Sequence, residues 1–318
     1  EAKGVNYPGG GATAKLTDRE DRSYLIENIF TYNVPIKDQK HKLTITAVQS
    51  VDHKQTKQLG YATDQLPVDM DWNFIANGQF TGSPIRSFTE NNLVSFMGRA
   101  SYILMDRYIM NVAVRRDGSS RFGKNNKWGT FPSVSLAWRI SDEAFMESTT
   151  SWLNNLKLRA GYGVTGNQAG IGEYKSLAVL SADGASYYDA ASGTWKKSYV
   201  QAQNVNPNLK WESTAQLNIG LDFGIFNRIN GTIEFYHKKT SDLLWTYPVP
   251  QPPYQVGTML ANVGDLVNKG IEVSLSANIL RQKDLTLDAN VTFAYNDQEI
   301  TKLSNDAYQA VGLQAGSL

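Results

Sequence analysis

The sequence has no cysteine and only three histidines, and this removes several kinds of chemistry at the outset. Disulfide scaffolds, thiol catalysis and cysteine-built metal sites are excluded, because each of them needs a sulfur atom. The three histidines, His41, His53 and His237, show no metal-ligand spacing, and no serine, histidine and acid arrangement stands out. We therefore expect no metal, no cofactor and no enzymatic activity.

Charge and long apolar runs are scarce as well. Charged residues make up 19% of the 318 residues, against roughly 25% in soluble domains, and the net charge of +1 argues against nucleic-acid binding. No window of about 18 uninterrupted apolar residues exists, and the mean hydropathy is -0.38, which excludes a bundle of membrane-spanning helices. A transmembrane β-barrel remains compatible with both facts, because only every second strand residue faces lipid.

The feature that is present almost everywhere is an apolar period of two. Apolar residues alternate with polar ones over residues 271–279 and again over 285–293. This alternation is typical of strands with one apolar and one polar face. Only residues 280–284 lie between the two runs, so the runs predict an antiparallel hairpin. Residues 217–223 and 229–235 predict a second hairpin of the same kind.

Earlier segments show the same pattern less clearly and bring the expected total to about ten strands. These segments are residues 22–36, 42–57, 91–104, 107–117, 130–142 and 153–164. Each is long enough for the roughly 9 to 11 residues that cross a bilayer, whereas soluble strands average about 5 to 6. A soluble β-sandwich also shows alternation, but its strands are usually shorter.

The expected connections alternate in length along the chain. They are short at 37–41, 104–107, 224–228 and 280–284, longer at 143–152, and long at about 58–90, 165–210 and 244–267. Short turns on one side and long loops on the other are typical of outer-membrane barrels. The sequence therefore predicts an all-β fold, an antiparallel transmembrane β-barrel portion of about ten strands from a larger barrel.

The pleat also predicts which side chains face lipid and which face the lumen, because a one-residue slip would move a whole polar row into hydrocarbon. We expect an outward apolar set of Ile271, Val273, Leu275, Leu285, Leu287, Val291, Leu217, Ile219 and Leu221. We expect an inward polar set of Glu272, Asp288, Asn290, Asn218 and Asp222.

Two glycine motifs imitate nucleotide sites. Residues 161–166 match G-x-G-x-x-G, but the residues that follow have no helical periodicity to offer a helix N-terminus to a pyrophosphate. Residues 118–124 nearly reproduce a phosphate-binding loop, but Asn125 stands where the motif needs serine or threonine. Both segments are interpreted as loops or strand ends.

Several separated blocks carry a resemblance to a known family. They are RRDGSSRFG at 115–123, WGTFPS at 128–133, AWRI at 137–140, LRAGYGVTGN at 158–167, NPNLKWE at 206–212, NIGLDF at 218–223, NVG at 262–264 and NKGIE at 268–272. Together they resemble, in order and context, the barrel of SusC/RagA-type TonB-dependent outer-membrane transporters.

This resemblance implies a protein of the cell outer membrane that imports a nutrient, a glycan oligosaccharide or a peptide. It implies outer-membrane lipid, a SusD-like surface lipoprotein and the TonB-ExbB-ExbD complex as partners, and no nucleic acid. Barrels of this kind have 22 strands around a plugged lumen. Residues 1–318 are therefore expected to be a partial barrel, with the plug domain and the C-terminal strands absent from this chain.

The long loops hold the candidate substrate-binding residues, whose aromatic faces could stack on sugar rings. They are Trp72, Tyr187, Tyr188, Trp195, Trp245, Tyr247 and Tyr254. The alternative is that they pack the loops or contact the lipoprotein. Arg116, Asp117 and Arg121 are expected to have a structural role, pairing within the barrel wall or a loop.

Three rival functions remain open at this point. One is a non-transport outer-membrane protein, such as an adhesin or a surface assembly subunit. Another is a siderophore-type TonB receptor. The third is an outer-membrane enzyme, which would need serine or acidic residues clustered with histidine in the lumen.

Overall fold

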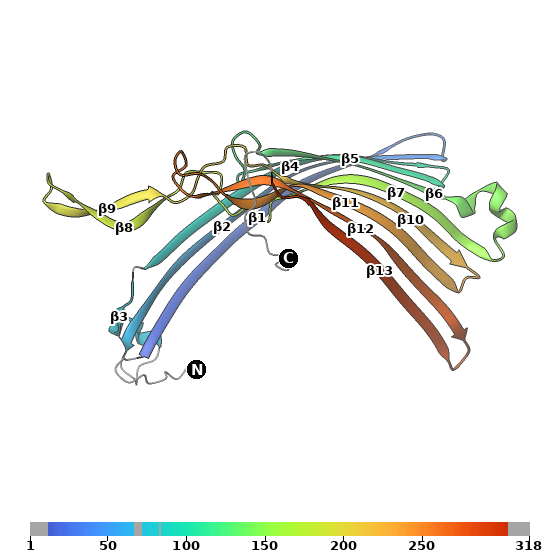
Figure 1. Cartoon of the computed structure of the whole chain (residues 1–318). Helices are drawn as coiled ribbons and strands as arrows, with labels where there is room; N and C mark the ends of the chain where they lie inside the picture. The colour runs from blue at the N-terminus through green and yellow to red at the C-terminus, as the bar shows by residue number, and fades with distance from the viewer. Residues whose placement is uncertain (1–11, 67–71, 83, 305–318) are drawn as a thin grey trace. The chain divides into compact units, whose positions relative to one another are not determined.

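The structure is a computed structural model that describes residues 12–66, 72–82 and 84–304 (Figure 1). Ten long strands follow one another in sheet order as a meander, β1-β2-β4-β5-β6-β7-β10-β11-β12-β13. Their bounds are β1 Ala12–Val34, β2 His41–Leu66, β4 Ile85–Leu104, β5 Tyr108–Ser119, β6 Trp128–Arg139, β7 Leu153–Asn167, β10 Glu212–Ile225, β11 Ile229–Pro248, β12 Thr258–Arg281 and β13 Thr286–Lys302. The expected all-β barrel portion of about ten strands is confirmed.

The remaining elements are short. A two-residue strand, β3 (Gln79–Phe80), pairs with β2, while β8 (Leu180–Asp189) and β9 (Thr194–Gln201) form a separate two-stranded sheet. Three 3-10 helices, η1 (Trp72–Asn77), η2 (Ile140–Asp142) and η3 (Ala144–Thr149), are the helical elements of the described residues. Within those ranges, no helix has the length and apolar character needed to cross a membrane.

Both predicted hairpins are antiparallel. Leu221 lies opposite Ile233 in the β10–β11 pair, and Val273 lies opposite Phe293 in the β12–β13 pair. The β10–β11 turn places Phe226 and Asn227 at φ values of 53° and 54°. Two successive residues with positive φ make the kind of tight turn that matches the twist of the flanking strands, and this fixes the register.

The strands continue further than the apolar periodicity indicates. The connection expected at 244–267 is only residues 249–257, because β11 runs to Pro248 and β12 begins at Thr258. Similarly, β2 runs to Leu66 and β4 begins at Ile85, so the connection expected at 58–90 is shorter. Backbone pairing does not require an apolar face, so polar residues extend the strands beyond the alternating segments.

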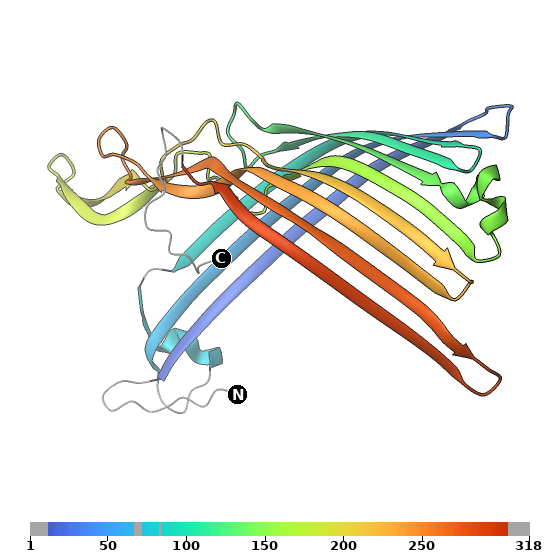
Figure 2. The same ribbon diagram turned by 45° about the vertical axis from the view of Figure 1, so that its right-hand side comes forward.

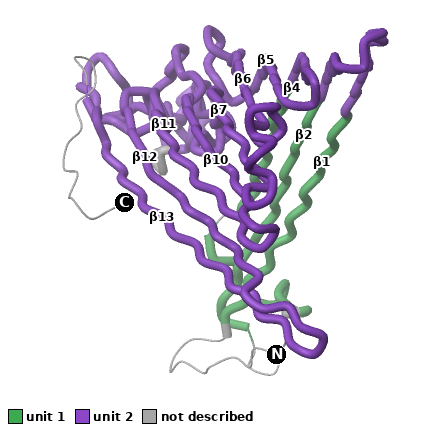
Figure 3. Tube along the Cα trace, turned by 90° about the vertical axis from the view of Figure 1, so that its right-hand side faces the viewer, with its two compact units in different colours: residues 1–26, 51–93 green, residues 27–50, 94–318 purple. Residues whose placement is uncertain are grey.

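The chain forms two compact units, residues 1–26 with 51–93 and residues 27–50 with 94–318 (Figure 3). In the second unit, the short turns gather at one end of the strands, and the connections 120–127, 168–211 and 249–257 lie at the other end (Figure 2). The β8–β9 hairpin belongs to the connection 168–211. We call these two ends of the second unit the short-turn end and the long-loop end.

Candidate functional site

The main sheet of the second unit has one apolar and one polar face. Direct strand partners form an apolar row across seven strands: Tyr108, Trp138, Leu158, Leu221, Ile233, Val273 and Phe293. The next positions form a polar row of Arg139, Lys157, Asp222, Thr232, Ser274 and Thr292. Since paired residues point to the same side of a sheet, the rows lie on opposite faces, as the sequence predicts.

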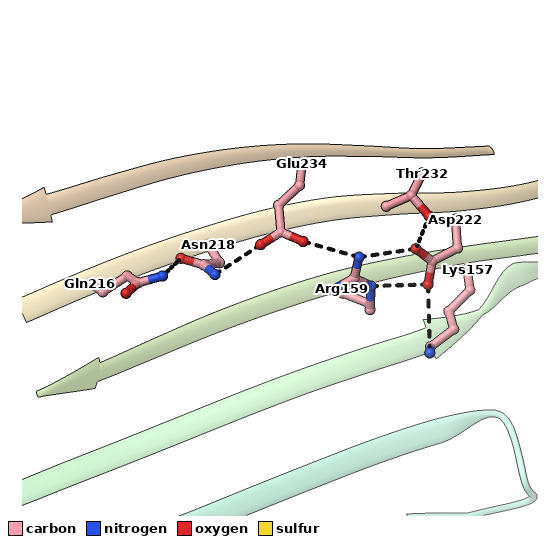
Figure 4. A network of polar contacts seen from close by, with 7 residues as sticks. All are labelled: Lys157, Arg159, Gln216, Asn218, Asp222, Thr232 and Glu234. Atoms are coloured by element: carbon pink, nitrogen blue, oxygen red, sulfur yellow. Dashed lines mark hydrogen bonds and ion pairs between the residues drawn. The ribbon is translucent and has the colours of Figure 1, made fainter. Parts of the chain in front are cut away.

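The polar face carries a connected network on β7, β10 and β11 (Figure 4). Arg159 donates to both carboxylate oxygens of Asp222, at 2.9 and 3.0 Å, and to Glu234 at 3.2 Å. Lys157 lies 3.6 Å from Asp222. Asn218 continues the network by donating to Glu234 at 2.9 Å. Two cations thus balance two carboxylates, and the wall has little net charge at this point.

The reach of Arg159 depends on a glycine. Arg159 lies opposite Gly220, and Gly220 lies opposite Glu234 on the following strand. A Cβ on Gly220 would lie 2.9 Å from the Nη2 atom of Arg159. Glycine therefore lets the guanidinium lie across β10 and bridge carboxylates on two strands. Sequence reasoning placed these charges on the polar face but did not predict this role of Gly220.

At the short-turn end, Glu143 fastens the connection that contains η2 and η3. It accepts hydrogen bonds from Tyr108 Oη at 2.6 Å, Trp138 Nε1 at 2.9 Å and Arg107 Nη1 at 3.1 Å. The hydrogen bond from Tyr108, followed by that from Trp138, lowers the pKa of Glu143. The connection is thereby held to the ends of β5 and β6.

At the long-loop end, the charges of the 115–123 block form separate contacts. Arg115 pairs with Asp117 at 2.9 Å, and Arg121 pairs with Glu173 at 2.7 Å. These contacts fit the structural role predicted for Asp117 and Arg121. Arg116 differs, because its guanidinium lies 5.5 Å from the ring centroid of Trp128 and its side chain is exposed.

The same block packs tightly against the segment before β10. Phe122 and Leu209 are buried, and the amide of Gly123 donates to the carbonyl of Leu209 at 3.2 Å. A Cβ on Gly123 would lie 2.2 Å from the carbonyl oxygen of Pro207. This position therefore requires glycine. The sequence alone indicated Gly123 only as part of the near match to a phosphate-binding loop.

Asparagine side chains join this segment to β12, a feature that sequence reasoning missed. Asn204 donates to the carbonyls of Val256 and Thr258, and Asn262 donates to that of Lys210 at 2.8 Å and accepts from its amide at 3.0 Å. These amides replace the missing backbone partners of an irregular segment. The asparagines at 204, 206 and 208 could have indicated these contacts, because asparagine side chains often form hydrogen bonds with backbone groups in loops.

The β8–β9 hairpin brings together three of the predicted binding residues. Tyr188 and Trp195 are strand partners with ring centroids 5.6 Å apart, and Tyr187 lies beside Tyr188. Their exposed fractions are 54% for Tyr187, 55% for Tyr188 and 71% for Trp195. At the hairpin tip, the hydrogen bond from Lys196 lowers the pKa of Asp189. Tyr188 and Trp195 thus form an exposed aromatic pair on one face of the hairpin, and Tyr187 lies on the opposite face.

The other predicted binding residues lie outside this hairpin. Trp245 on β11 is exposed at 46%, and Tyr254 in the following connection is half-buried. Tyr247 is only 1% exposed, and its hydroxyl donates to the carbonyl of Leu303 at 2.9 Å. Tyr247 is therefore buried beside Ala261 and Val263, and its ring is not exposed. Trp72 begins η1, and its side chain lies outside the described residues.

No group of acidic residues and histidines that could hold a metal occurs among the described residues. His41 and His53 contact Tyr102 and Asn92, respectively. Gly161 and Gly163 lie within β7, so the G-x-G-x-x-G motif begins inside a strand and does not open a helix.

Two tryptophans of β6 mark the height of the apolar face. Trp138 stacks on Tyr108 with centroids 6.3 Å apart at the short-turn end, and Trp128 contacts Phe96 at 6.3 Å toward the long-loop end. Ten residues separate the tryptophans, which is about 34 Å along a strand. A barrel tilt of about 40° reduces this to about 26 Å, close to the roughly 25 Å apolar band between aromatic girdles. These features define the wall of an outer-membrane β-barrel.

The sequence matches the family described as "TonB dependent receptor-like, beta-barrel" over residues 4–316. The chain therefore belongs to the TonB-dependent receptors, which are proteins of the outer membrane.

Relatives are known in sequence and in structure. The chain is 41% identical to TonB-dependent receptor SusC of Bacteroides thetaiotaomicron over 232 residues, 72% of this chain and 23% of the relative. It is 34% identical to TonB-dependent receptor P3 of Formosa agariphila, over 93% of this chain and 29% of the relative. The RagAB peptide transporter structure matches with a TM-score of 0.79 and 31% identity, over 91% of this chain and 31% of that chain. The chain thus spans less than a third of each of them.

BauA, the ferric preacinetobactin receptor from Acinetobacter baumannii, matches with a TM-score of 0.52 and 17% identity, over 94% of this chain and 40% of that chain. At this identity the likeness shows the shared barrel fold alone.

Proposed function

We propose that the chain forms part of the barrel wall of a TonB-energised importer that carries a nutrient, an oligosaccharide or a peptide, across the outer membrane. The observation that carries the proposal is the likeness to SusC in sequence and to the RagAB peptide transporter in structure, over most of this chain. The division of the sheet into an apolar and a polar face supports the proposal, because the polar face would line the lumen through which the nutrient passes.

The polar face suits a neutral or zwitterionic cargo. Arg159 and Lys157 are paired with Asp222 and Glu234, so this part of the wall offers hydrogen bonds without a strong field of one sign. Amide groups such as Asn218 extend the polar surface along the strands. Sugars and peptides, which carry many donors and acceptors, would exchange hydrogen bonds with such a wall.

Capture is assigned to the long-loop end. Tyr187, Tyr188 and Trp195 offer exposed ring faces, with Trp245 and Tyr254 as further candidates. Aromatic rings stack on sugar rings or side chains at modest conformational cost. A SusD-like lipoprotein is proposed to cover this end, and TonB, ExbB and ExbD to act through a plug within the complete barrel.

The rival functions receive less support. The likeness to the ferric preacinetobactin receptor concerns the fold only. An adhesin would not need a polar network along the inward face. We assign the chain no catalytic reaction.

The proposal is tested in cells that lack the full-length receptor and are complemented with it or with variants. Uptake of fluorescent oligosaccharide and peptide mixtures is measured with and without a protonophore. We expect receptor-dependent uptake of one mixture that the protonophore abolishes. Uptake that is unchanged by deletion, or that persists with the protonophore, would contradict energised import.

A variant with Tyr187, Tyr188 and Trp195 all changed to alanine tests the capture surface. The matched control is Phe145→Ala, which removes a 66% exposed aromatic side chain at the short-turn end. We expect the triple variant to lower uptake and the control to leave it unchanged. Equal uptake by the two variants would remove the hairpin from the capture site without affecting the transport proposal.

A further inference from the structure

The outward apolar face of β5 ends on a single cation. Tyr108, Met110, Val112 and Val114 are exposed at alternate positions of the strand, and Arg116 is the next residue of that row. None of the ion pairs among the described residues includes Arg116. Its guanidinium instead lies over the Trp128 ring. An unpaired charge on a lipid-facing row calls for an explanation, because such a charge is costly inside the bilayer.

The position of Arg116 along the strand makes this charge tolerable. It is eight residues from Tyr108, about 27 Å along the strand and about 20 Å in height at a tilt of 40°. Trp128, its ring partner, belongs to the long-loop end of the apolar band. Arg116 therefore lies near the headgroup level of the leaflet at that end, where the cost of a charge falls to about 0 to 1 kcal/mol.

A groove adjoins Arg116 on this face. It is lined by Phe30, Phe96, Gly98 and Val114 together with Arg116 itself. A Cβ built on Gly98 would meet no atom within 4 Å, so the floor of the groove is open above this glycine. Phe30, Phe96 and Val114 supply the aromatic and aliphatic side chains around this opening.

Two amide side chains, those of Asn28 and Gln49, also line the groove. Asn28 donates to Gln49 at 2.7 Å. His41 contacts Tyr102 between β2 and β4, and Gln49 and Phe96 lie eight and six residues from that contact on their own strands. Both therefore lie well away from the short-turn end of their strands, and they line the same groove as Arg116. Glu27 also lines the groove but belongs to the alternate row of β1.

We propose that this groove binds a phospholipid of net negative charge in the leaflet at the long-loop end. The phosphate pairs with Arg116 beside the amides of Asn28 and Gln49. An acyl chain lies over Gly98 against Phe96 and Val114. The arrangement of charge at the headgroup level and an open apolar floor below it matches the chemistry of an anionic lipid.

The test uses the complete receptor, purified in detergent and mixed with equal amounts of phosphatidylglycerol and phosphatidylcholine of the same chain length. Native mass spectrometry measures the lipid that remains bound. We expect about fivefold preferential retention of phosphatidylglycerol, the size expected for one cation near a membrane surface. Arg116→Gln should abolish the preference, and Arg116→Lys should keep most of it because the charge remains.

Arg99→Gln is the matched control. It removes the same charge from the polar face, where Arg99 donates to Asn111 at 3.0 Å, and it should leave the preference unchanged. Gly98→Leu should lower retention of both lipids by filling the floor. Folding of every variant is checked by heat-modifiable gel mobility.

The proposal is overturned if Arg116→Gln keeps the preference, or if Arg99→Gln removes it equally. Where Arg116→Gln fails to fold, loss of the preference in Arg116→Lys overturns it. Displacement of phosphatidylglycerol by millimolar inorganic phosphate alone would also overturn it, because a free anion cannot use the apolar groove.

Discussion

Placing an arginine on each face of β12 in turn should have very different effects. Leu275 lies on the apolar face, opposite Val291 of β13, and its exposed fraction is 37%. Ser274 is its neighbour on the polar face, opposite Thr292. Leu275→Arg and Ser274→Arg add the same charge to adjacent positions of one strand.

The magnitude follows from the depth of the two positions. Leu275 lies six residues before the end of β12 at Arg281, about 20 Å along the strand and about 15 Å in height at a tilt of 40°. This is near the middle of a roughly 25 Å apolar band, where arginine on the lipid face costs about 2 to 4 kcal/mol. Leu275→Arg should therefore reduce the folded-to-unfolded ratio by a factor of roughly 30 to 1000.

The assay is refolding of the full-length receptor into lipid vesicles, read by heat-modifiable gel mobility over a urea series. Ser274→Arg should cost less than about 1 kcal/mol, because its side chain reaches the aqueous side. Equal destabilisation by the two variants would refute the assignment of faces. A larger effect of Ser274→Arg would reverse it.

Three further predictions concern the network, the loop junction and the short-turn end. Arg159→Ala should lower the free energy of unfolding in the same assay by about 1 to 2 kcal/mol, because it leaves the carboxylates of Asp222 and Glu234 without their shared cation. Lys157→Ala should lower it by less. Gly123→Ala should destabilise by about 1 to 3 kcal/mol through overpacking, whereas Gly170→Ala, with nothing within 4 Å of its Cβ, should be neutral; equal urea midpoints would contradict this. Glu143 has a lowered pKa, so its stabilisation is present above the ordinary carboxyl range and is lost as pH falls through the lowered value. Amide hydrogen exchange of residues 140–149 should accelerate, relative to the exchange of an unfolded chain, as pH falls through the pKa of Glu143. No such change in that pH range would count against the prediction.

The faces and the tight hairpins could be predicted from the sequence because they depend on local rules. Alternation reports the pleat directly, and a short turn such as Phe226 with Asn227 leaves little choice of register. The ends of β11 and β12 could not be predicted in the same way. Above the apolar band, pairing continues through backbone hydrogen bonds, and the side chains no longer need to alternate.

The candidate site was only partly predictable because burial of a loop aromatic depends on distant residues. Trp245 and Tyr247 lie on the same strand and look alike in sequence, yet Tyr247 is buried beside Ala261 and its hydroxyl bonds to Leu303. In the same way, the need for glycine at 220 comes from Arg159 on a neighbouring strand. Neither partner is indicated by local sequence.

The central claim is that alternate residues of these strands face lipid and an aqueous lumen. It is tested most directly by placing single cysteines along residues 286–295 of the full-length receptor, freed of any other cysteine, and attaching spin labels in lipid vesicles. We predict that labels at 287, 289, 291, 293 and 295 are relaxed mainly by oxygen, and labels at the intervening positions mainly by a water-soluble nickel complex. Uniform access of the nickel complex along the strand, or a period other than two, would contradict the claim.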